Sequence, residues 1–246
     1  MVKSDFYNVV DFGASKIRFS TFNKTLEGNF LDVINLPIEK EDSQVSNEFN
    51  NIIKKAEKKI SSHIKNIILT LDTNDLICID ISIFKNYDNS IYLSKIYDSI
   101  LLELNNLIIS NYSNHNIIHT ILNQINVDEN IFYSLPKEKI KIKSIKAEFK
   151  IICFPKEIVS NYKKKFKKNN LNIDRIFCTS YLKSSSYARK LNKKNVFFLD
   201  IGFKKTSLIT FENFRFKMLQ IFPIGGFHIT NDISKVFKIS MEEAEN

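Results

Sequence analysis

Two short segments of this chain place an aspartate, a glycine and small polar residues directly after an apolar strand. One is Asn8–Phe22 (NVVDFGASKIRFSTF) and the other is Asn195–Phe211 (NVFFLDIGFKKTSLITF). Each pattern predicts a β-hairpin with an aspartate, Asp11 or Asp200, at the polar end of its first strand. Two such units in one chain indicate two similar halves that face one ligand.

The glycines favour phosphate as that ligand. The chain has only five glycines, and four of them, Gly13, Gly202, Gly225 and Gly226, lie at strand ends before turns. Glycine allows a tight turn and a close approach to a ligand. Backbone N–H groups in such turns hold anions, and a helix beginning after Gly226 would add its dipole. One Asp-x-Gly unit alone is typical of an ordinary hairpin turn, but two copies and a downstream Gly-Gly-x-x-x-Thr favour a phosphate site.

Carboxylates, hydroxyls and lysines stand close to these glycines in the sequence. Asp11 and Asp200 are the expected positions for a hydrated Mg²⁺ that bridges to a polyphosphate. Four residues could supply hydroxyl or ammonium contacts to phosphate oxygens: Ser15, Lys16, Lys204 and Thr206.

Net charge and cysteine content indicate the kind of binding partner and the cellular compartment. The net charge of +9 permits an acidic partner. The densest basic run, Lys163–Lys168, lacks the aromatic and arginine residues of a nucleic-acid face, so it is interpreted as a solvated helix end. Cys78, Cys153 and Cys178 are widely spaced in apolar segments, which predicts buried free thiols and a reducing cytosol.

Hydrophobic periodicity predicts a mixed α/β chain, and the pattern of strands and helices changes in its middle third. The expected strands are residues 6–10, 16–23, 30–37, 67–71, 76–84, 117–128, 140–154, 173–177 and 215–222, in addition to the second hairpin. The expected helices are residues 46–65, 91–110, 156–169 and 180–191, a helix from Thr230 and the start of a further helix at Ser240. Residues 73 to about 150 are interpreted as an inserted small α/β module.

The motifs resemble those of the FtsA family, in the actin/Hsp70 ATPase superfamily. Asp11–Ile17 (DFGASKI) is similar to the first phosphate motif, and Leu199–Gly202 (LDIG) to the start of the second. Pro223–Ile233 (PIGGFHITNDI) is close to the family's Pro-x-Gly-Gly-x-x-Ile-Thr-x-Asp-Ile. Ser240 with Ala244 and Glu245 resembles the start of the nucleotide-binding Ser-x-x-x-Ala-Glu helix, and Ile118–Gln124 (IHTILNQ) resembles the family's inserted subdomain.

The resemblance implies an actin-like (ribonuclease H-like) ATPase fold, incomplete, with an inserted SHS2-type subdomain. It implies subdomain 1A at residues 1–72 and 151–192, the insertion 1C at 73–150, and the first part of 2A at 193–246. ATP and Mg²⁺ are the implied ligands, with Asp11 and Asp200 positioning the Mg²⁺–ATP. The implied nucleotide contacts are Gly13, Ala14, Ser15, Lys16, Gly202, Lys204, Thr206, Gly225, Gly226 and Glu245.

The chain departs from the family pattern at three places. Phe203, Lys204 and Lys205 replace flexible glycines of the second phosphate motif, which restricts φ and close approach but adds charge that phosphate could meet. Ala14 replaces a threonine, leaving Ser15 as a substitute hydroxyl. The remainder of 2A, subdomain 2B, the adenine motif and a C-terminal membrane helix would follow Asn246, so the chain is expected to be truncated.

By resemblance, the complete protein binds ATP, forms filaments and links the FtsZ ring to the inner face of the cytoplasmic membrane. It is at most a weak ATPase, it is peripheral and cytoplasmic, and it binds no nucleic acid. FtsZ binding would belong to the absent 2B. Three alternatives stay open: a PilM-like pilus-assembly scaffold, a nucleotide-free structural descendant, and a sugar or acetate kinase, for which no acidic general base is evident.

Overall fold

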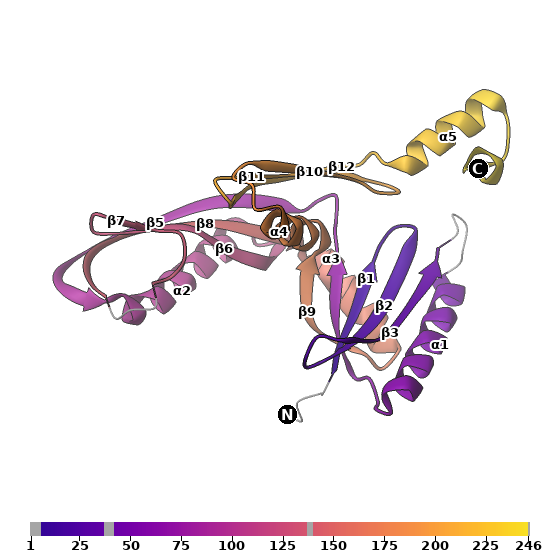
Figure 1. Ribbon diagram of the computed structural model, residues 1–246, viewed down its shortest axis with the longest axis horizontal. Helices are drawn as coiled ribbons and strands as arrows, with labels where there is room; N and C mark the ends of the chain where they lie inside the picture. Colours follow the sequence, from indigo (N-terminus) through magenta and orange to yellow (C-terminus); the bar gives the residue numbers. More distant parts are fainter. Residues whose placement is uncertain (1–5, 37–41, 137–139, 246) are drawn as a thin grey trace.

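The computed structural model describes residues 6–36, 42–136 and 140–245, so the outer ends of the expected subdomains, at residues 1 and 246, lie outside the described residues. The described residues form three separate sheets with helices against them (Figure 1). The four-stranded sheet extends to one side of the molecule and the C-terminal helices to the other (Figure 1).

A five-stranded sheet carries the first hairpin. Its strands are β1 (Phe6–Phe12), β2 (Lys16–Asn23), β3 (Gly28–Asn35), β4 (Asn66–Leu71) and β9 (Asn172–Cys178), in the spatial order β3-β2-β1-β4-β9. β4 runs parallel to both β1 and β9, while β1, β2 and β3 form an antiparallel meander. The carboxyl ends of β1, β4 and β9 therefore meet at one edge of the sheet.

Two helices cover one face of this sheet. They are α1 (Asp42–Ile60) and α3 (Lys156–Lys168). Phe49 of α1 and Phe166 of α3 pack edge to face with ring centroids 5.5 Å apart, above the buried strand residues Val10 and Phe19. The helical spacing of Phe49 and the apolar residues after it in α1 produces this buried stripe.

A four-stranded antiparallel sheet forms the inserted module. Its strands are β5 (Ile77–Tyr92), β6 (His115–Val127), β7 (Asn130–Phe132) and β8 (Lys141–Pro155), in the order β5-β8-β6-β7. The helix α2 (Leu93–Asn111) buries apolar residues at helical spacing against it, namely Leu93, Ile96, Ile100, Leu104 and Ile108. β5 continues eight residues beyond the predicted end at Phe84, and the short β7 was not predicted.

The strand β8 belongs to two hydrophobic cores at once. Ile145, Ala147, Phe149, Ile151 and Cys153 lie in the core of the insertion. Ile152 and Phe154 lie in the core of the five-stranded sheet. The alternation of a β-strand sends neighbouring side chains to opposite faces, so the expected subdomain boundary at residues 150–151 falls inside a continuous strand.

The second hairpin opens a three-stranded sheet of β10 (Val196–Ile201), β11 (Thr206–Glu212) and β12 (Arg215–Phe222). The helix α4 (Thr179–Leu191) precedes it, and α5 (Gly226–Phe237) and α6 (Met241–Glu245) follow. The prediction that a helix starts at Thr230 was wrong by one turn, because α5 begins at Gly226. Within the described residues, no helix is long and apolar enough to cross a membrane.

Candidate nucleotide site

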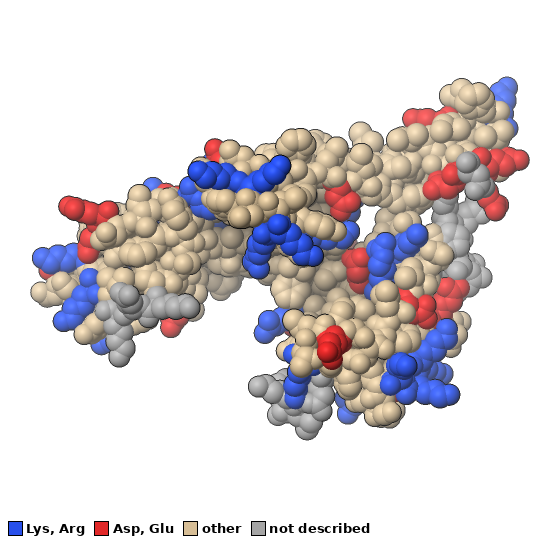
Figure 2. Space-filling view, viewed as in Figure 1, with Lys and Arg blue, Asp and Glu red and all other residues tan. Residues whose placement is uncertain are grey.

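The two hairpins face a common cavity. Its volume is about 770 Å³, and its lining comes from the β1–β2 turn, the end of β4, the start of α4, the β10–β11 turn and Glu245 of α6. Figure 2 shows the surface hollowed between the part that carries α5 and the five-stranded sheet, with acidic and basic side chains beside the hollow. The structure thus brings together residues that are almost 190 positions apart, from Asp11 to Asp200.

The turns of the two hairpins have the same hydrogen bond. The Gly13 N–H donates to the Lys16 carbonyl at 2.9 Å, and the Gly202 N–H donates to the Lys205 carbonyl at 2.8 Å. A Cβ added to Gly13 would lie 2.8 Å from the Lys16 oxygen, and one added to Gly202 would lie 3.0 Å from the Lys205 oxygen. Gly13 therefore requires glycine because of close approach, a Cβ at Gly202 would be tightly crowded, and the expected internal similarity extends to the two Gly-x-x-Lys turns.

The three residues that replace the family's glycines adopt ordinary backbone conformations. Phe203, Lys204 and Lys205 are not among the described residues with positive φ. The Phe203 ring packs against that of Phe227 at 5.4 Å, and the Lys204 ammonium lies 5.7 Å from the same ring. The turn therefore uses only φ values that are ordinary for residues with side chains, in keeping with the restriction expected from the sequence.

The β10–β11 turn is hydrogen-bonded to the start of α5. The Gly226 N–H donates to the Gly202 carbonyl at 2.9 Å, and the Phe227 N–H donates to the Phe203 carbonyl at 2.7 Å. A Cβ on Gly225 would collide with the Gly202 oxygen and lie 2.7 Å from the Phe203 oxygen. These helix N–H groups are thus used by the turn, in place of the direct phosphate contact expected for them.

The remaining expected contact residues divide into two groups. Ala14, Ser15, Lys16 and Lys204 line the cavity, as does Glu245, which accepts a hydrogen bond from Thr230 Oγ1 at 2.8 Å. Thr206, Gly225 and Gly226 do not line it. The Thr206 hydroxyl donates to the Ile224 carbonyl at 2.7 Å, which ties the second hairpin to the segment before α5.

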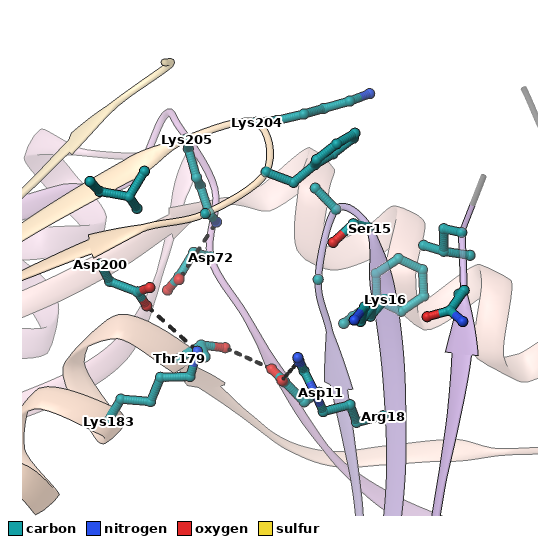
Figure 3. Close-up of a pocket in the computed structure, with 18 of the residues that line it drawn as sticks. Asp11, Ser15, Lys16, Arg18, Asp72, Thr179, Lys183, Asp200, Lys204 and Lys205 are labelled. Carbon is teal, nitrogen blue, oxygen red and sulfur yellow. Dashed lines mark hydrogen bonds and ion pairs between the residues drawn. The ribbon is translucent and has the colours of Figure 1, made fainter. Parts of the chain in front are cut away.

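Asp11 and Asp200 stand at matching strand ends with a cation beside each (Figure 3). Arg18 Nη1 donates to Asp11 Oδ2 at 3.0 Å, and Thr70 Oγ1 donates to Asp11 Oδ1 at 2.9 Å. Lys183 Nζ lies 3.5 Å from Asp200 Oδ2. Arg18 is the cross-strand partner of Asp11, and Lys183 reaches Asp200 from α4.

A third carboxylate, Asp72, was missed by the sequence analysis. Its side chain is only 7% exposed and lies 3.6 Å from Lys205 Nζ. Its oxygens accept hydrogen bonds from the Ser180 hydroxyl at 2.7 Å, the Ser180 N–H at 3.1 Å and the Cys178 thiol at 3.1 Å. Burial, then the nearby Asp72 charge, raises the pKa of the Cys178 thiol well above its usual value. The signal was available, because Asp72 follows a buried strand just as Asp11 does.

These carboxylates do not fit the expected magnesium ion. Each of Asp11, Asp72 and Asp200 is paired with a lysine or arginine of the chain itself. A divalent cation placed at these oxygens would also meet the positive charge already there.

Two polar residues of the family-like segment Ile118–Gln124, His119 and Gln124, contact the rest of the molecule. His119 packs against Tyr181 with ring centroids 4.8 Å apart, and its Nε2 accepts the Cys178 N–H at 3.0 Å. Burial lowers the pKa of His119 to about 4. Gln124 Oε1 accepts a hydrogen bond from Arg215 Nη1 of β12 at 2.9 Å.

Comparison with known proteins agrees with these motifs. A family model described as cell division protein FtsA matches residues 197–246. Over 131 residues the chain is 30% identical to the cell division protein FtsA of Bacillus subtilis (strain 168), and the match covers 52% of this chain and 29% of that protein. The resemblance to the FtsA family is confirmed. The FtsA-like match therefore spans less than a third of the relative's length.

A solved structure is similar in fold to nearly the whole chain. The structure titled "PilM-PilN type IV pilus biogenesis complex" superposes with a TM-score of 0.67 and covers 97% of this chain and 68% of its own, at 13% identity. At that identity the likeness concerns the fold alone. The chain has the mixed α/β, actin-like ATPase fold expected from its FtsA-like motifs.

Proposed function

We propose that this chain binds ATP in the cavity between its two hairpins and acts in cell division as an FtsA-like protein. The observation that carries the proposal is the pair of Gly-x-x-Lys turns, which present Lys16 and Lys205 to one cavity of about 770 Å³. Lysine ammonium groups and turn backbones are the usual partners of phosphate oxygens. Glu245, at the cavity wall, is the proposed ribose or base contact.

The proposed cellular role rests on the likeness to FtsA. As an FtsA-like protein it would form filaments, bind FtsZ and other division proteins, and lie at the inner face of the cytoplasmic membrane. In this chain, residues 73–150 would serve as the 1C contact module, residues 1–72 and 151–192 as 1A, and residues from 193 onward as the first part of 2A. Nucleotide would bias closure of the cleft and the contacts between subunits.

We expect hydrolysis to be weak at most. A water molecule that attacks the terminal phosphate needs a carboxylate or amide to orient it. Asp11, Asp72 and Asp200 are each already paired with a cation of the chain, so none of them is positioned to orient that water. The proposed function of nucleotide here is binding with slow turnover.

Isothermal calorimetry with ATP tests the proposal on the chain as it is. ATP is expected to bind, and Lys16→Ala should weaken binding about 10- to 100-fold, because a charge-assisted hydrogen bond contributes roughly 1.5–3 kcal/mol. Lys217→Ala is the matched control, since Lys217 lies on β12, does not line the cavity and should bind like the wild type. Absence of ATP binding, or equal binding by Lys16→Ala, would refute the nucleotide site.

A second candidate is a PilM-like pilus-assembly scaffold, which the fold likeness over 97% of the chain favours. The two candidates differ in their partners. Purified FtsZ and a purified PilN-type peptide can each be tested for binding to this chain. Binding of the peptide but not of FtsZ would favour the pilus scaffold.

A further inference from the structure

We propose that this cleft binds the polyphosphate of a nucleotide without a divalent metal, and that lysine and arginine side chains of the chain take the place of the metal. The inference rests on the proposed nucleotide site and concerns how that site holds its phosphates. It follows from three features of the cleft: the pairing of its carboxylates, the free donors of its lysines, and the balance of its charges.

The first feature is that each aspartate of the cleft has its own cation. Arg18 is paired with Asp11 at 3.0 Å, and Lys183 is paired with Asp200 at 3.5 Å. Lys205 is the partner of the buried Asp72 at 3.6 Å. A magnesium ion between carboxylates and phosphate normally neutralises both, and here the neutralisation of the carboxylates is already provided.

The second feature is that the lysine partners keep hydrogen-bond donors available. An ammonium group has three N–H donors. The distances of 3.5 Å for Lys183 and 3.6 Å for Lys205 are those of ion pairs longer than a normal hydrogen bond. Both ammonium groups can therefore donate to phosphate oxygens while they stay beside their carboxylates.

Asp72 holds Lys205 in this position. Asp72 is fixed by the hydrogen bonds from Ser180 and Cys178, and its side chain is 7% exposed against 24% for Lys205. Figure 3 shows Lys205 directed toward Asp72, whereas Lys204 on the same turn is directed away. Lys205 of the second turn is thus a fixed cation at the cleft, opposite Lys16 of the first turn.

The third feature is the charge balance of the cavity lining. The lining contains five basic residues, Lys16, Arg18, Lys183, Lys204 and Lys205, against four acidic ones, Asp11, Asp72, Asp200 and Glu245. The excess of one positive charge attracts a polyphosphate and disfavours a free divalent cation. Asp11 and Asp200 in this cleft orient the chain's own cations.

The direct test is calorimetric titration of the wild-type chain with ATP in MgCl₂ and, separately, in EDTA. MgCl₂ and EDTA are each used at about 5 mM, in excess of the ATP. The affinities are expected to agree within about 3-fold. Binding in magnesium that is lost in EDTA would overturn metal independence and leave the nucleotide site standing. Absence of binding under both conditions would overturn both proposals.

Two variants separate a cation role from a metal role. Lys205→Gln should weaken ATP binding in EDTA about 10- to 100-fold and regain part of it in magnesium, because Asp72 is then free to face the metal. Asp200→Asn should tighten ATP binding in both buffers, because Lys183 is released to the phosphates. A magnesium bridge through Asp200 would instead make this variant bind ATP more weakly than the wild type in magnesium. Lys217→Ala should match the wild type in both buffers. Unchanged binding by Lys205→Gln, or weakened binding by Asp200→Asn, would refute the inference.

Discussion

The neutral state of His119 makes the stability of this protein depend on pH in a defined window. The ring lies between Phe177 and Tyr181, with centroid distances of 5.6 Å and 4.8 Å. Its Nε2 accepts the Cys178 N–H at 3.0 Å, so the ring is neutral with its proton on Nδ1. Burial lowers the pKa of His119 from 6.5 to about 4.

The sign and size of the effect follow from linkage. Above pH 6.5 the ring carries no extra proton in either state. As the pH falls below 6.5, the unfolded chain binds a proton that the folded protein accepts only near pH 4, so stability decreases through this window and levels off below it. The full loss is about 3 kcal/mol, of which about 2 kcal/mol should be lost by pH 5.

Urea unfolding followed by circular dichroism at pH 7.5, 6 and 5 measures this loss. His119→Gln keeps an acceptor for the Cys178 N–H and does not titrate, so the wild type should lose about 2 kcal/mol more than the variant between pH 7.5 and 5. Gly28→Ala is the control, because it changes no titratable group and leaves its Cβ 3.8 Å from the nearest atom, so it should keep the wild-type slope. Equal slopes for the wild type and His119→Gln would refute the reasoning.

Two further predictions concern packing and the contact of the insertion. Gly225→Ala should destabilise the protein by about 1–3 kcal/mol in urea unfolding, since its Cβ has no room against the β10–β11 turn. Gly28→Ala is the control, because its Cβ would meet its nearest neighbour at 3.8 Å, and it should change stability by less than about 1 kcal/mol. A smaller loss for Gly225→Ala than for Gly28→Ala would contradict this. Arg215→Ala removes the hydrogen bond to Gln124 and should cost about 1–2 kcal/mol, against less than about 0.5 kcal/mol for Lys217→Ala on the same strand. Equal losses for these two variants would show that the Gln124 contact contributes nothing.

Local sequence patterns predicted the positions of those strands whose side chains alternate between the core and the surface. The predicted strand at residues 16–23 coincides with β2, because its alternating apolar residues are buried against one core. The predicted strand at residues 215–222 likewise coincides with β12. Apolar periodicity records burial directly, so it locates such elements well.

The parts that the sequence could not predict depend on contacts between distant segments. The last eight residues of β5, Lys85–Tyr92, are mostly polar and have no apolar alternation. Residues 85, 86, 91 and 92 extend the edge strand by backbone pairing with β8, on either side of a register shift between Asn86 and Ile91, and side-chain patterns do not record this pairing. The start of α5 is set in the same way by carbonyl groups of the β10–β11 turn.

In the candidate site, too, local features were predictable and contacts between distant residues were not. The turns around Gly13 and Gly202 were predicted from their local sequence. The pairing of Asp200 with Lys183, and of Asp72 with Lys205, joins residues on separate elements whose side-chain distances become known only in the folded chain. The expectation of a magnesium site was therefore made without knowledge of the cations that the fold brings to the carboxylates.

The continuous strand β8 has a mechanical consequence for the insertion. Side chains at Ile151 and Ile152, one residue apart, lie in two different cores. The backbone between the cores has no loop that could act as a hinge, and bending there would break hydrogen bonds to both β5 and β6. A force applied to the insertion by a neighbouring molecule would therefore pass along β8 to Pro155 and the first turn of α3, so the insertion can act as a lever on the five-stranded sheet.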